Sequence, residues 1–309
     1  MEGERGGRDR APHRSALVVV DGGASRCRLA AFDANGARVG TAVVESPASL
    51  TLGEREAWDT IRTGIERLAR ELGVPERALG RWLPTRLALG LAGALQEERR
   101  ARFLARLERA TGGTTRCRLV TDGHAQLVGA SGGRPGVCLA IGTGSVVHWM
   151  DHSGGHGMAG GWGFPIGDEG SGAWLGARLL QRHLWHRDGE TCDSPLMAAL
   201  AARWGDSVSE LQRLTTETRS TVHAALAPLV VGAAEAGDAL ALSLLEEGAD
   251  WCARLVARAP PTLPVHVVGG LAGAYLPALS ASLGARLTRP RGDALDGLRL
   301  IGARLLDED

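Results

Sequence analysis

Residues 136–176 read GVCLAIGTGSVVHWMDHSGGHGMAGGWGFPIGDEGSGAWLG, and the expected architecture follows from this stretch. The apolar run 137–141 predicts a buried strand, and 146–150 predicts the strand that returns beside it. Between them lies the turn Gly142-Thr143-Gly144-Ser145. Glycines let a backbone approach an anion closely, and the N–H groups and two hydroxyls of this turn are donors for phosphate oxygens. The turn is therefore a candidate phosphate-binding loop.

A second glycine cluster surrounds Trp162, and Gly167-Asp168-Glu169-Gly170-Ser171 precedes a predicted helix over 173–184. Acidic residues at a helix start interact favourably with the helix dipole, so Asp168 is a candidate cap. An acid pair between two glycines, just after a phosphate-like turn, could equally hold a polyhydroxy substrate. Both interpretations of Asp168 stay open at this point.

The composition indicates a globular α/β enzyme and narrows its chemistry. The net formal charge is zero, which argues against a nucleic-acid or membrane-surface protein. The 44 glycines show no period, and 44% of the residues are apolar, enough for a substantial core. All 35 basic residues are arginine, so a P-loop of the GxxxxGK[ST] type and Schiff-base chemistry are excluded.

The cysteines and the chain start favour a cytoplasmic protein. The five cysteines are scattered without CxxC spacing, as expected for reduced thiols. We expect no signal peptide and no membrane span, and we expect residues 1–15 to form a disordered tail. The cysteines are Cys27, Cys117, Cys138, Cys192 and Cys252.

The layout around Gly142 also occurs near the start of the chain. Residues 16–20 are an apolar run, 21–26 read DGGASR, and the runs 27–32 and 39–44 complete a predicted three-stranded meander. Gly22 and Gly142 lie 120 residues apart, about one domain's length. Two such units suggest a duplicated fold with a phosphate loop in each half.

Helices alternating with strands predict a mostly parallel sheet behind the first meander. The glycine-rich segment 131–136 is the expected domain boundary, which divides the chain into domains at 16–131 and 132–293. A closing helix over 294–306, capped by Asp293, is expected to complete the first domain. The other predicted elements are helices at 54–72, 97–110, 125–130 and 271–283, strands at 87–91, 118–121 and 265–268, and three or four helical segments within 195–260.

Three segments together resemble the sugar kinase/Hsp70/actin superfamily. Residues 21–26 are similar to its first phosphate loop, 142–145 to its second, and 267–272 (VVGGLA) to its adenosine motif. Gly160-Gly161-Trp162-Gly163 followed by 167–171 resembles the N-acetylglucosamine kinase branch of the BadF/BadG/BcrA/BcrD ATPase family. The resemblance covers about residues 16–306. It implies duplicated actin-like ATPase (ribonuclease H-like) domains with a central cleft.

The resemblance also assigns roles. It implies that Asp21 orients Mg²⁺ through water, although an aspartate before two glycines is also common in simple turns. Asp122, at a predicted strand end, resembles the catalytic aspartate; as general base it would accept the proton of a sugar hydroxyl. An N-cap role for Asp122 could coexist with catalysis. The implied ATP-binding residues are Gly22, Gly23, Ser25, Arg26, Gly142, Thr143, Gly144, Gly237, Gly269 and Gly270. For Gly237, the favoured alternative is a break between two helices.

The substrate side departs from the family pattern. No asparagine occurs near 46–49, where the family has a sugar-contacting one, and Ser49 is the nearest polar residue. Val146 also stands where related kinases have a polar residue, so glucosamine and N-acetylglucosamine are both candidates. The implied sugar-binding residues are Ser49, Asp122, Ser145, Gly161, Trp162, Gly163, Asp168 and Glu169.

We therefore expect a cytoplasmic, homodimeric kinase that transfers phosphate from ATP with Mg²⁺ to an amino sugar, at the C6 hydroxyl. The alternative is an ATPase that activates a partner enzyme, as in the related dehydratase and reductase activators. Those activators hold an iron–sulfur cluster with cysteines, and the cysteines here lack a matching setting. His148, His152 and His156 do not share a helix face, because glycines interrupt them, so we expect loop histidines and no zinc.

Overall fold

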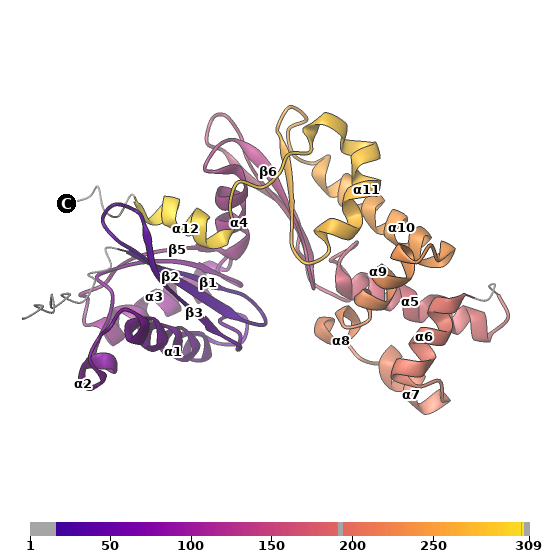
Figure 1. The fold of residues 1–309 in the computed structure, drawn as a ribbon, viewed down its shortest axis with the longest axis horizontal. Helices are drawn as coiled ribbons and strands as arrows, with labels where there is room; N and C mark the ends of the chain where they lie inside the picture. Colours follow the sequence, from indigo (N-terminus) through magenta and orange to yellow (C-terminus); the bar gives the residue numbers. More distant parts are fainter. Residues whose placement is uncertain (1–16, 191–193, 304, 306–309) are drawn as a thin grey trace, which may run out of the picture. The chain divides into compact units, whose positions relative to one another are not determined.

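The structure, a computed structural model, describes residues 17–190, 194–303 and 305. The chain divides into two compact units: unit 1 comprises Met1–Gly133 with Gly292–Asp309, and unit 2 comprises Arg134–Arg291 (Figure 1). The first crossing, between Gly133 and Arg134, lies within the glycine-rich segment 131–136. The expected tail, 1–15, lies outside the described residues.

Unit 1 contains a five-stranded sheet in the order β3-β2-β1-β4-β5. The first three strands form an antiparallel meander, while β4 and β5 run parallel to β1. The strands are β1 Leu17–Gly22, β2 Cys27–Phe32, β3 Arg38–Val44, β4 Arg86–Leu91 and β5 Arg116–Thr121.

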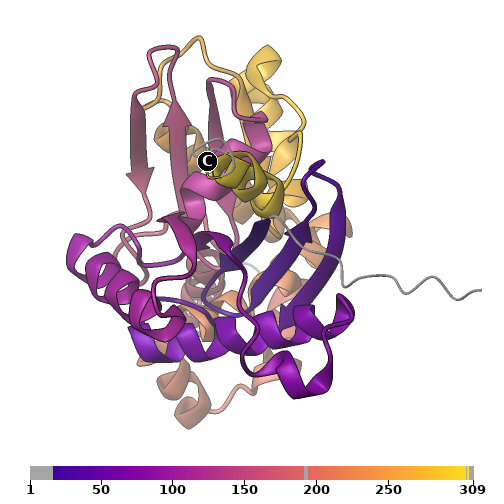
Figure 2. The same cartoon turned by 90° about the vertical axis from the view of Figure 1, so that its left-hand side faces the viewer.

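Helices cover both faces of this sheet, as Figures 1 and 2 show. Because side chains alternate along a strand, Val18 and Val20 pack in the core beneath one layer, and Leu17 and Val19 pack beneath the other. The first layer holds α1 Glu54–Glu71 and α3 Glu97–Thr111, with the short α2 Glu76–Leu79 beside them; the second holds α4 Asp122–Ser131 and α12 Ala294–Ala303.

The helices α4 and α12 approach each other through glycines. A Cβ on Gly297 would collide with the carbonyl of Ala125 and lie 2.6 Å from the backbone nitrogen of Gly129. A Cβ on Gly129 would in turn collide with the carbonyl of Asp293. The last helix therefore packs directly on the helix that begins at Asp122.

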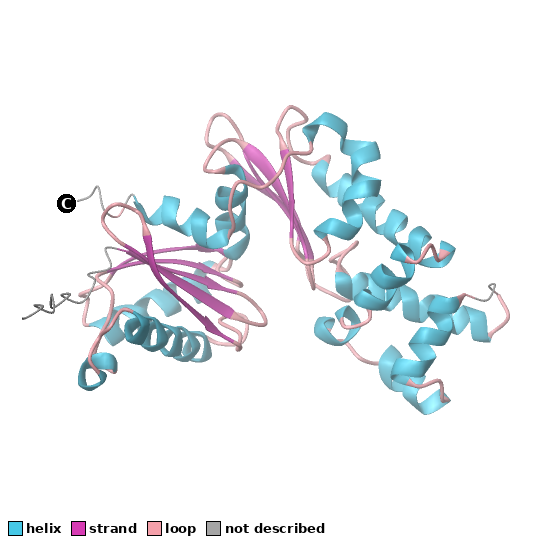
Figure 3. Cartoon of the chain, in the orientation of Figure 1, coloured by secondary structure: helices cyan, strands magenta, loops and turns pink. Residues whose placement is uncertain are grey.

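Unit 2 contains a four-stranded sheet in the order β8-β7-β6-β9 (Figure 3). Its meander matches that of unit 1, and β9 runs parallel to β6. The sequence did not predict β8, because HGMAG lacks the β-branched and aromatic residues that favour strands. The strands are β6 Gly136–Ile141, β7 Ser145–Met150, β8 His156–Gly160 and β9 Val265–Val268.

The helical part of unit 2 is more divided than predicted. Five helices lie between residues 195 and 260, where three or four segments were expected, and Gly205 and Gly237 adopt positive φ at two of the breaks. Over the described ranges no single helix could cross a membrane, although a bent helix pair, Ser220–Glu235 with Ala239–Val256, has the length and composition. The helices are α5 Gly172–Arg187, α6 Pro195–Trp204, α7 Val208–Thr215, α8 Ser220–Ala224, α9 Ala227–Glu235, α10 Ala239–Val256 and α11 Ala272–Leu283, followed by the 3₁₀ turn η1 Gly284–Arg286.

Candidate active site

Two carboxylates lie at one edge of the unit 1 sheet. The register aligns Gly22 of β1 with Leu91 of β4, and Leu91 with Thr121 of β5. Asp21 is near the end of β1, and Asp122 directly follows β5. Since parallel strands end at the same edge of a sheet, where α/β folds bind ligands, both acids belong to one candidate site.

Asp122 is the first residue of α4, and it is not the N-cap. Thr121 is the cap, because its Oγ1 accepts a hydrogen bond of 3.1 Å from the backbone N–H of His124. Burial raises the pKa of Asp122; the backbone N–H of Gly123, 2.9 Å from its Oδ1, opposes this, and the charge of Asp21 raises the pKa further. A carboxylate with a raised pKa is better suited to accept a proton than an ordinary surface aspartate.

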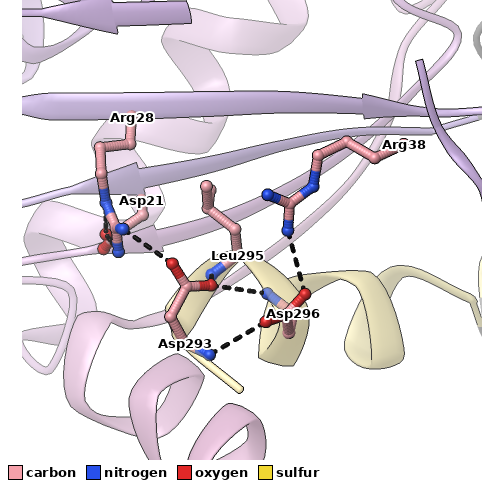
Figure 4. A network of polar contacts seen from close by, with 6 residues as sticks. All are labelled: Asp21, Arg28, Arg38, Asp293, Leu295 and Asp296. Atoms are coloured by element: carbon pink, nitrogen blue, oxygen red, sulfur yellow. Dashed lines mark hydrogen bonds and ion pairs between the residues drawn. The ribbon is translucent and has the colours of Figure 1, made fainter. Parts of the chain in front are cut away.

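Asp21 pairs with an arginine that the sequence analysis missed. The register of β1 and β2 sets Asp21 opposite Arg28, whose Nε and Nη2 donate to Oδ2 of Asp21 at 2.9 and 2.6 Å (Figure 4). Arg26, the predicted phosphate-binding arginine, is exposed beside Ser25 in the turn. The signal was present in the sequence: a tight turn over 23–26 sets Asp21 and Arg28 opposite each other.

The loop after β3 is bound to the end of β1. Ala48 donates to the carbonyl of Gly23 at 3.1 Å, and a Cβ on Gly22 would lie 2.5 Å from the carbonyl of Ala48. Ser49 is buried, and its hydroxyl lies 2.7 Å from that of Thr51. The structure thus brings Ser49 to the candidate site, with its hydroxyl engaged inside the loop, while Thr51 is exposed.

The two glycine turns of unit 2 also share a sheet edge. Gly142 follows β6 and Gly269 follows β9, which is parallel to β6. The first two residues of α5 donate to this turn, Gly172 to the carbonyl of Gly142 at 2.8 Å and Ala173 to that of Thr143 at 3.2 Å. Gly269 has φ 103°, and a Cβ there would collide with the end of β6, whereas Gly270 is exposed beside open space.

Asp168 is not the cap of α5. That role belongs to Ser171, whose hydroxyl accepts from the backbone N–H of Trp174 at 3.2 Å. Asp168 adopts φ 64°, and its Oδ1 accepts from Gly163 at 3.2 Å. Its other oxygen lies so close to Gly144 that a Cβ there would be 2.5 Å away. The carboxylate therefore lies between two glycine segments that were both predicted to bind ligands.

The surroundings of Asp168 are partly buried. Burial raises its pKa, and hydrogen bonds from Gly163 and other backbone groups oppose the shift. The hydroxyl of Ser145 is buried and donates to the carbonyl of Glu169 at 2.7 Å, so it fixes the loop and does not point to solvent. Between Gly161 and Gly163, the side chain of Trp162 is 83% exposed. A large exposed aromatic ring beside this acid is suited to a ligand surface.

Gly237 follows the C-cap of α9 with φ 85°, and the carboxylate of Asp238 then caps α10 by accepting a hydrogen bond from the backbone N–H of Ala241 at 2.9 Å. This geometry gives Gly237 a structural role as a helix break. Gly237 also lines a mostly apolar cavity of about 820 Å³ between α6, α9 and α10. None of the other predicted nucleotide-binding residues lines this cavity among the residues that the structure describes.

The acid pair of unit 1 has the donor chemistry that Mg²⁺ prefers, because carboxylate oxygens are hard ligands. Both bonds from Arg28 use Oδ2 of Asp21, and the described residues make no hydrogen bond to its Oδ1. Over the described ranges, no group of three or more His, Cys, Asp or Glu side chains could enclose a metal ion. Mg²⁺ held partly by water and phosphate is compatible with this donor set.

Two of the histidines considered for a zinc site lie on the neighbouring strands β7 and β8, and three of the described cysteines are buried. His148 is opposite Met158 in the β7–β8 pair, and His156 is opposite Met150. Of the cysteines, Cys27, Cys138 and Cys252 are buried, which raises their thiol pKa to about 12 in each case. Cys192 lies outside the described residues.

Known proteins share both the sequence and the fold. The model of the BadF/BadG/BcrA/BcrD ATPase family matches residues 18–283. The glucosamine kinase GspK of Vibrio cholerae is 27% identical over 294 residues, 93% of this chain and 95% of that protein. A candidate N-acetylglucosamine kinase of Chromobacterium violaceum is 32% identical, with a TM-score of 0.83 over 94% of this chain and 99% of that one. A ROK family glucokinase from Streptomyces griseus shares the fold at 17% identity, 93% and 99% coverage and a TM-score of 0.60.

A duplicated α/β unit with a glycine turn at the carboxyl edge of each sheet defines the actin-like ATPase class, and the solved relatives have the same fold. Within that class, the chain belongs to the BadF/BadG/BcrA/BcrD ATPase family.

Proposed function

We propose that this protein is an ATP-dependent kinase that phosphorylates an amino sugar, glucosamine or N-acetylglucosamine, at its C6 hydroxyl. Membership of an ATPase family and the full-length similarity to kinases named for these two sugars support the proposal. The observation that carries it is the position of Asp122, beside Asp21 at the carboxyl edge of the sheet, with a raised pKa.

Asp122 acts as the general base. The sugar hydroxyl oxygen attacks the γ-phosphorus of ATP, and its proton passes to the carboxylate of Asp122. The bond between the γ-phosphorus and the bridging oxygen breaks, so that ADP leaves with the bonding electrons. Asp21 would hold Mg²⁺, which supplies charge neutralisation on the phosphate oxygens when bound.

The glycine turns and the Trp162 loop bind the two substrates. Backbone N–H groups at the turns after β1 and β6 donate hydrogen bonds to phosphate oxygens. The nucleoside lies against Gly269 and Gly270. Asp168 accepts hydrogen bonds from sugar hydroxyls, which are worth about 1.5–3 kcal/mol each when one partner is charged. Trp162 packs against the sugar ring.

The test is ATP consumption measured against glucosamine, N-acetylglucosamine, glucose and 6-deoxyglucosamine. The proposal predicts turnover with at least one amino sugar and none with the 6-deoxy analogue, which lacks the acceptor oxygen. Turnover with the 6-deoxy analogue would rule out C6. Rapid ATP hydrolysis without any sugar would favour the partner-activating ATPase. Cys138 is buried on β6, so its thiol is not accessible to an iron–sulfur cluster of the kind that the related activators hold.

A further inference from the structure

Arg28 joins two carboxylates from distant parts of unit 1 (Figure 4). Its Nε and Nη2 donate to Oδ2 of Asp21 at 2.9 and 2.6 Å, and its Nη1 donates to Oδ2 of Asp293 at 2.8 Å. Asp293 follows 265 residues later, directly before α12. A guanidinium presents its donors in a rigid planar fork, so it fixes the directions of both carboxylates.

The Asp293 end of this Asp21–Arg28–Asp293 bridge is itself held in place. Oδ1 of Asp293 accepts from the backbone N–H groups of Leu295 and Asp296 at 3.0 and 3.2 Å, which caps α12. Leu295 and Leu298 then bury α12 against the sheet. Asp293 therefore connects Arg28 to a helix that cannot move without disturbing a core.

The near end of the bridge is shielded from water. The side chain of Asp21 is 14% exposed and that of Arg28 is 26% exposed, whereas Asp293 is 45% exposed. An ion pair away from bulk solvent is stronger and more directional than one on the surface. The restraint is therefore greatest at Asp21.

We propose that Arg28 is a positioning residue for phosphoryl transfer, which holds the carboxylate of Asp21 in one orientation by anchoring it to the first turn of α12. The inference rests on the proposed function, where Asp21 holds Mg²⁺. Arg28 acts through Asp21, because its Nε, Nη1 and Nη2 all donate to Asp21 or Asp293.

The chain contains a matched control. Arg38 of β3 forms an ion pair of 3.0 Å with Asp296, in the same first turn of α12 (Figure 4). Arg38→Met removes an arginine–aspartate pair between the sheet and this helix, but leaves Asp21, Arg28 and Asp293 intact. Any effect of Arg28→Met that Arg38→Met lacks is therefore caused by loss of the Asp21–Arg28–Asp293 contacts.

The experiment compares Arg28→Met, Arg28→Lys, Asp293→Asn and Arg38→Met with the wild type. A misplacement of about 1 Å can lower a rate about 10²-fold, so we expect a kcat loss of about that size in Arg28→Met, with KM for the sugar little changed. Arg28→Lys keeps the charge without the fork and should recover part of kcat. Asp293→Asn should lower kcat less than Arg28→Met, and Arg38→Met should keep it.

Two measurements need no sugar. Calorimetric titration of the protein with Mn²⁺ in the presence of ADP should show an undiminished Mn²⁺ affinity in Arg28→Met. The reason is that loss of the guanidinium removes a positive charge that repels the cation. Hydrogen exchange at the amides of Leu295 and Asp296 should accelerate in Arg28→Met more than in Arg38→Met, since Asp293 loses its partner.

Equal kcat values for Arg28→Met and Arg38→Met would overturn the proposal. The proposal would also be overturned if the fold-loss of kcat in Arg28→Met equalled its fold-loss of Mn²⁺ affinity. The same holds if a thermal melt showed that Arg28→Met is unfolded at the assay temperature. Unaltered exchange at the α12 amides would contradict the bridge itself. A wild-type chain that phosphorylates no amino sugar would contradict the proposed function alone, because the exchange and Mn²⁺ results stand without it.

Discussion

Asp122 combines burial with the proximity of a second carboxylate, and both raise its pKa. A general base must be ionised, so the rate should fall as the pH decreases through this raised pKa. Asp122→Asn removes the proton acceptor and keeps the side-chain shape. We expect kcat to fall about 10²–10⁴-fold, with sugar binding retained in a calorimetric titration. Near-normal turnover would remove Asp122 from the mechanism.

The same residue has a consequence for stability. For a carboxyl group whose pKa is raised by folding, the contribution to stability is fully present below the unfolded pKa and is lost as the pH rises through the folded pKa. At pH 7 the ionised Asp122 therefore lowers stability. Asp122→Asn should raise the melting temperature at pH 7, and the difference from wild type should shrink towards pH 3. A lower melting temperature of Asp122→Asn than of the wild type at pH 7 would contradict the conclusion that the ionised carboxylate of Asp122 lowers stability.

Asp168 allows a separation of ligand binding from helix capping. Asp168→Asn should weaken sugar binding far more than nucleotide binding, because a charged acceptor is lost. Ser171→Ala is the control: it removes the α5 cap, which should cost about 1 kcal/mol of stability and leave sugar affinity unchanged. Calorimetry and thermal melts measure both quantities. Unchanged sugar affinity in Asp168→Asn would restrict Asp168 to bracing the loop.

At the scale of elements, the packing of α4 on α12 depends on glycine. Gly297→Ala would place a Cβ against the carbonyl of Ala125 and 2.6 Å from the backbone of Gly129, so the helices must separate. We expect a loss of about 1–3 kcal/mol in the free energy of unfolding, measured with urea. Because α4 begins at Asp122, kcat should fall as well.

Gly232→Ala is the matched control. Gly232 lies inside α9, and a Cβ there would meet no atom within 4 Å. Alanine is the better helix former by about 0.8–1.0 kcal/mol, so this variant should be more stable. Equal effects of the two substitutions would show that propensity alone, and no contact between α4 and α12, governs Gly297.

At the scale of the whole molecule, the two units differ in continuity. Unit 2 is one continuous segment, 134–291, with its own sheet and core. Unit 1 requires α12, which packs on Leu17, Val19 and Ala88 from the end of the chain. We expect the fragment 134–291 to fold alone, and the fragment 1–133 to remain unfolded. Circular dichroism during heating tests both, and 1–133 joined through a flexible linker to 292–309 should regain a cooperative transition.

The sequence by itself determined the elements and the glycine turns, because these depend on neighbouring residues. A nearly continuous apolar run such as CRLAAF predicts a strand buried on both faces, and β2 has the predicted bounds 27–32. At the turn after β9, Gly269 adopts φ 103°, which glycine allows. β8 escaped prediction for the same reason: HGMAG pairs with β7 without any strand preference of its own. The meander of unit 1, the β6–β7 pair of unit 2 and the family resemblance followed from these local patterns.

Only the tertiary structure decided which side chains meet. Arg28 bonds to Asp293 across 265 residues of sequence, the carboxylate of Asp168 lies against Gly144, and the hydroxyl of Ser49 turns into its own loop. Thr121 and Ser171 take the capping positions considered for Asp122 and Asp168, and so leave these carboxylates for other partners. Such contacts depend on how layers pack and where each backbone bends, and spacing along the chain does not encode those distances.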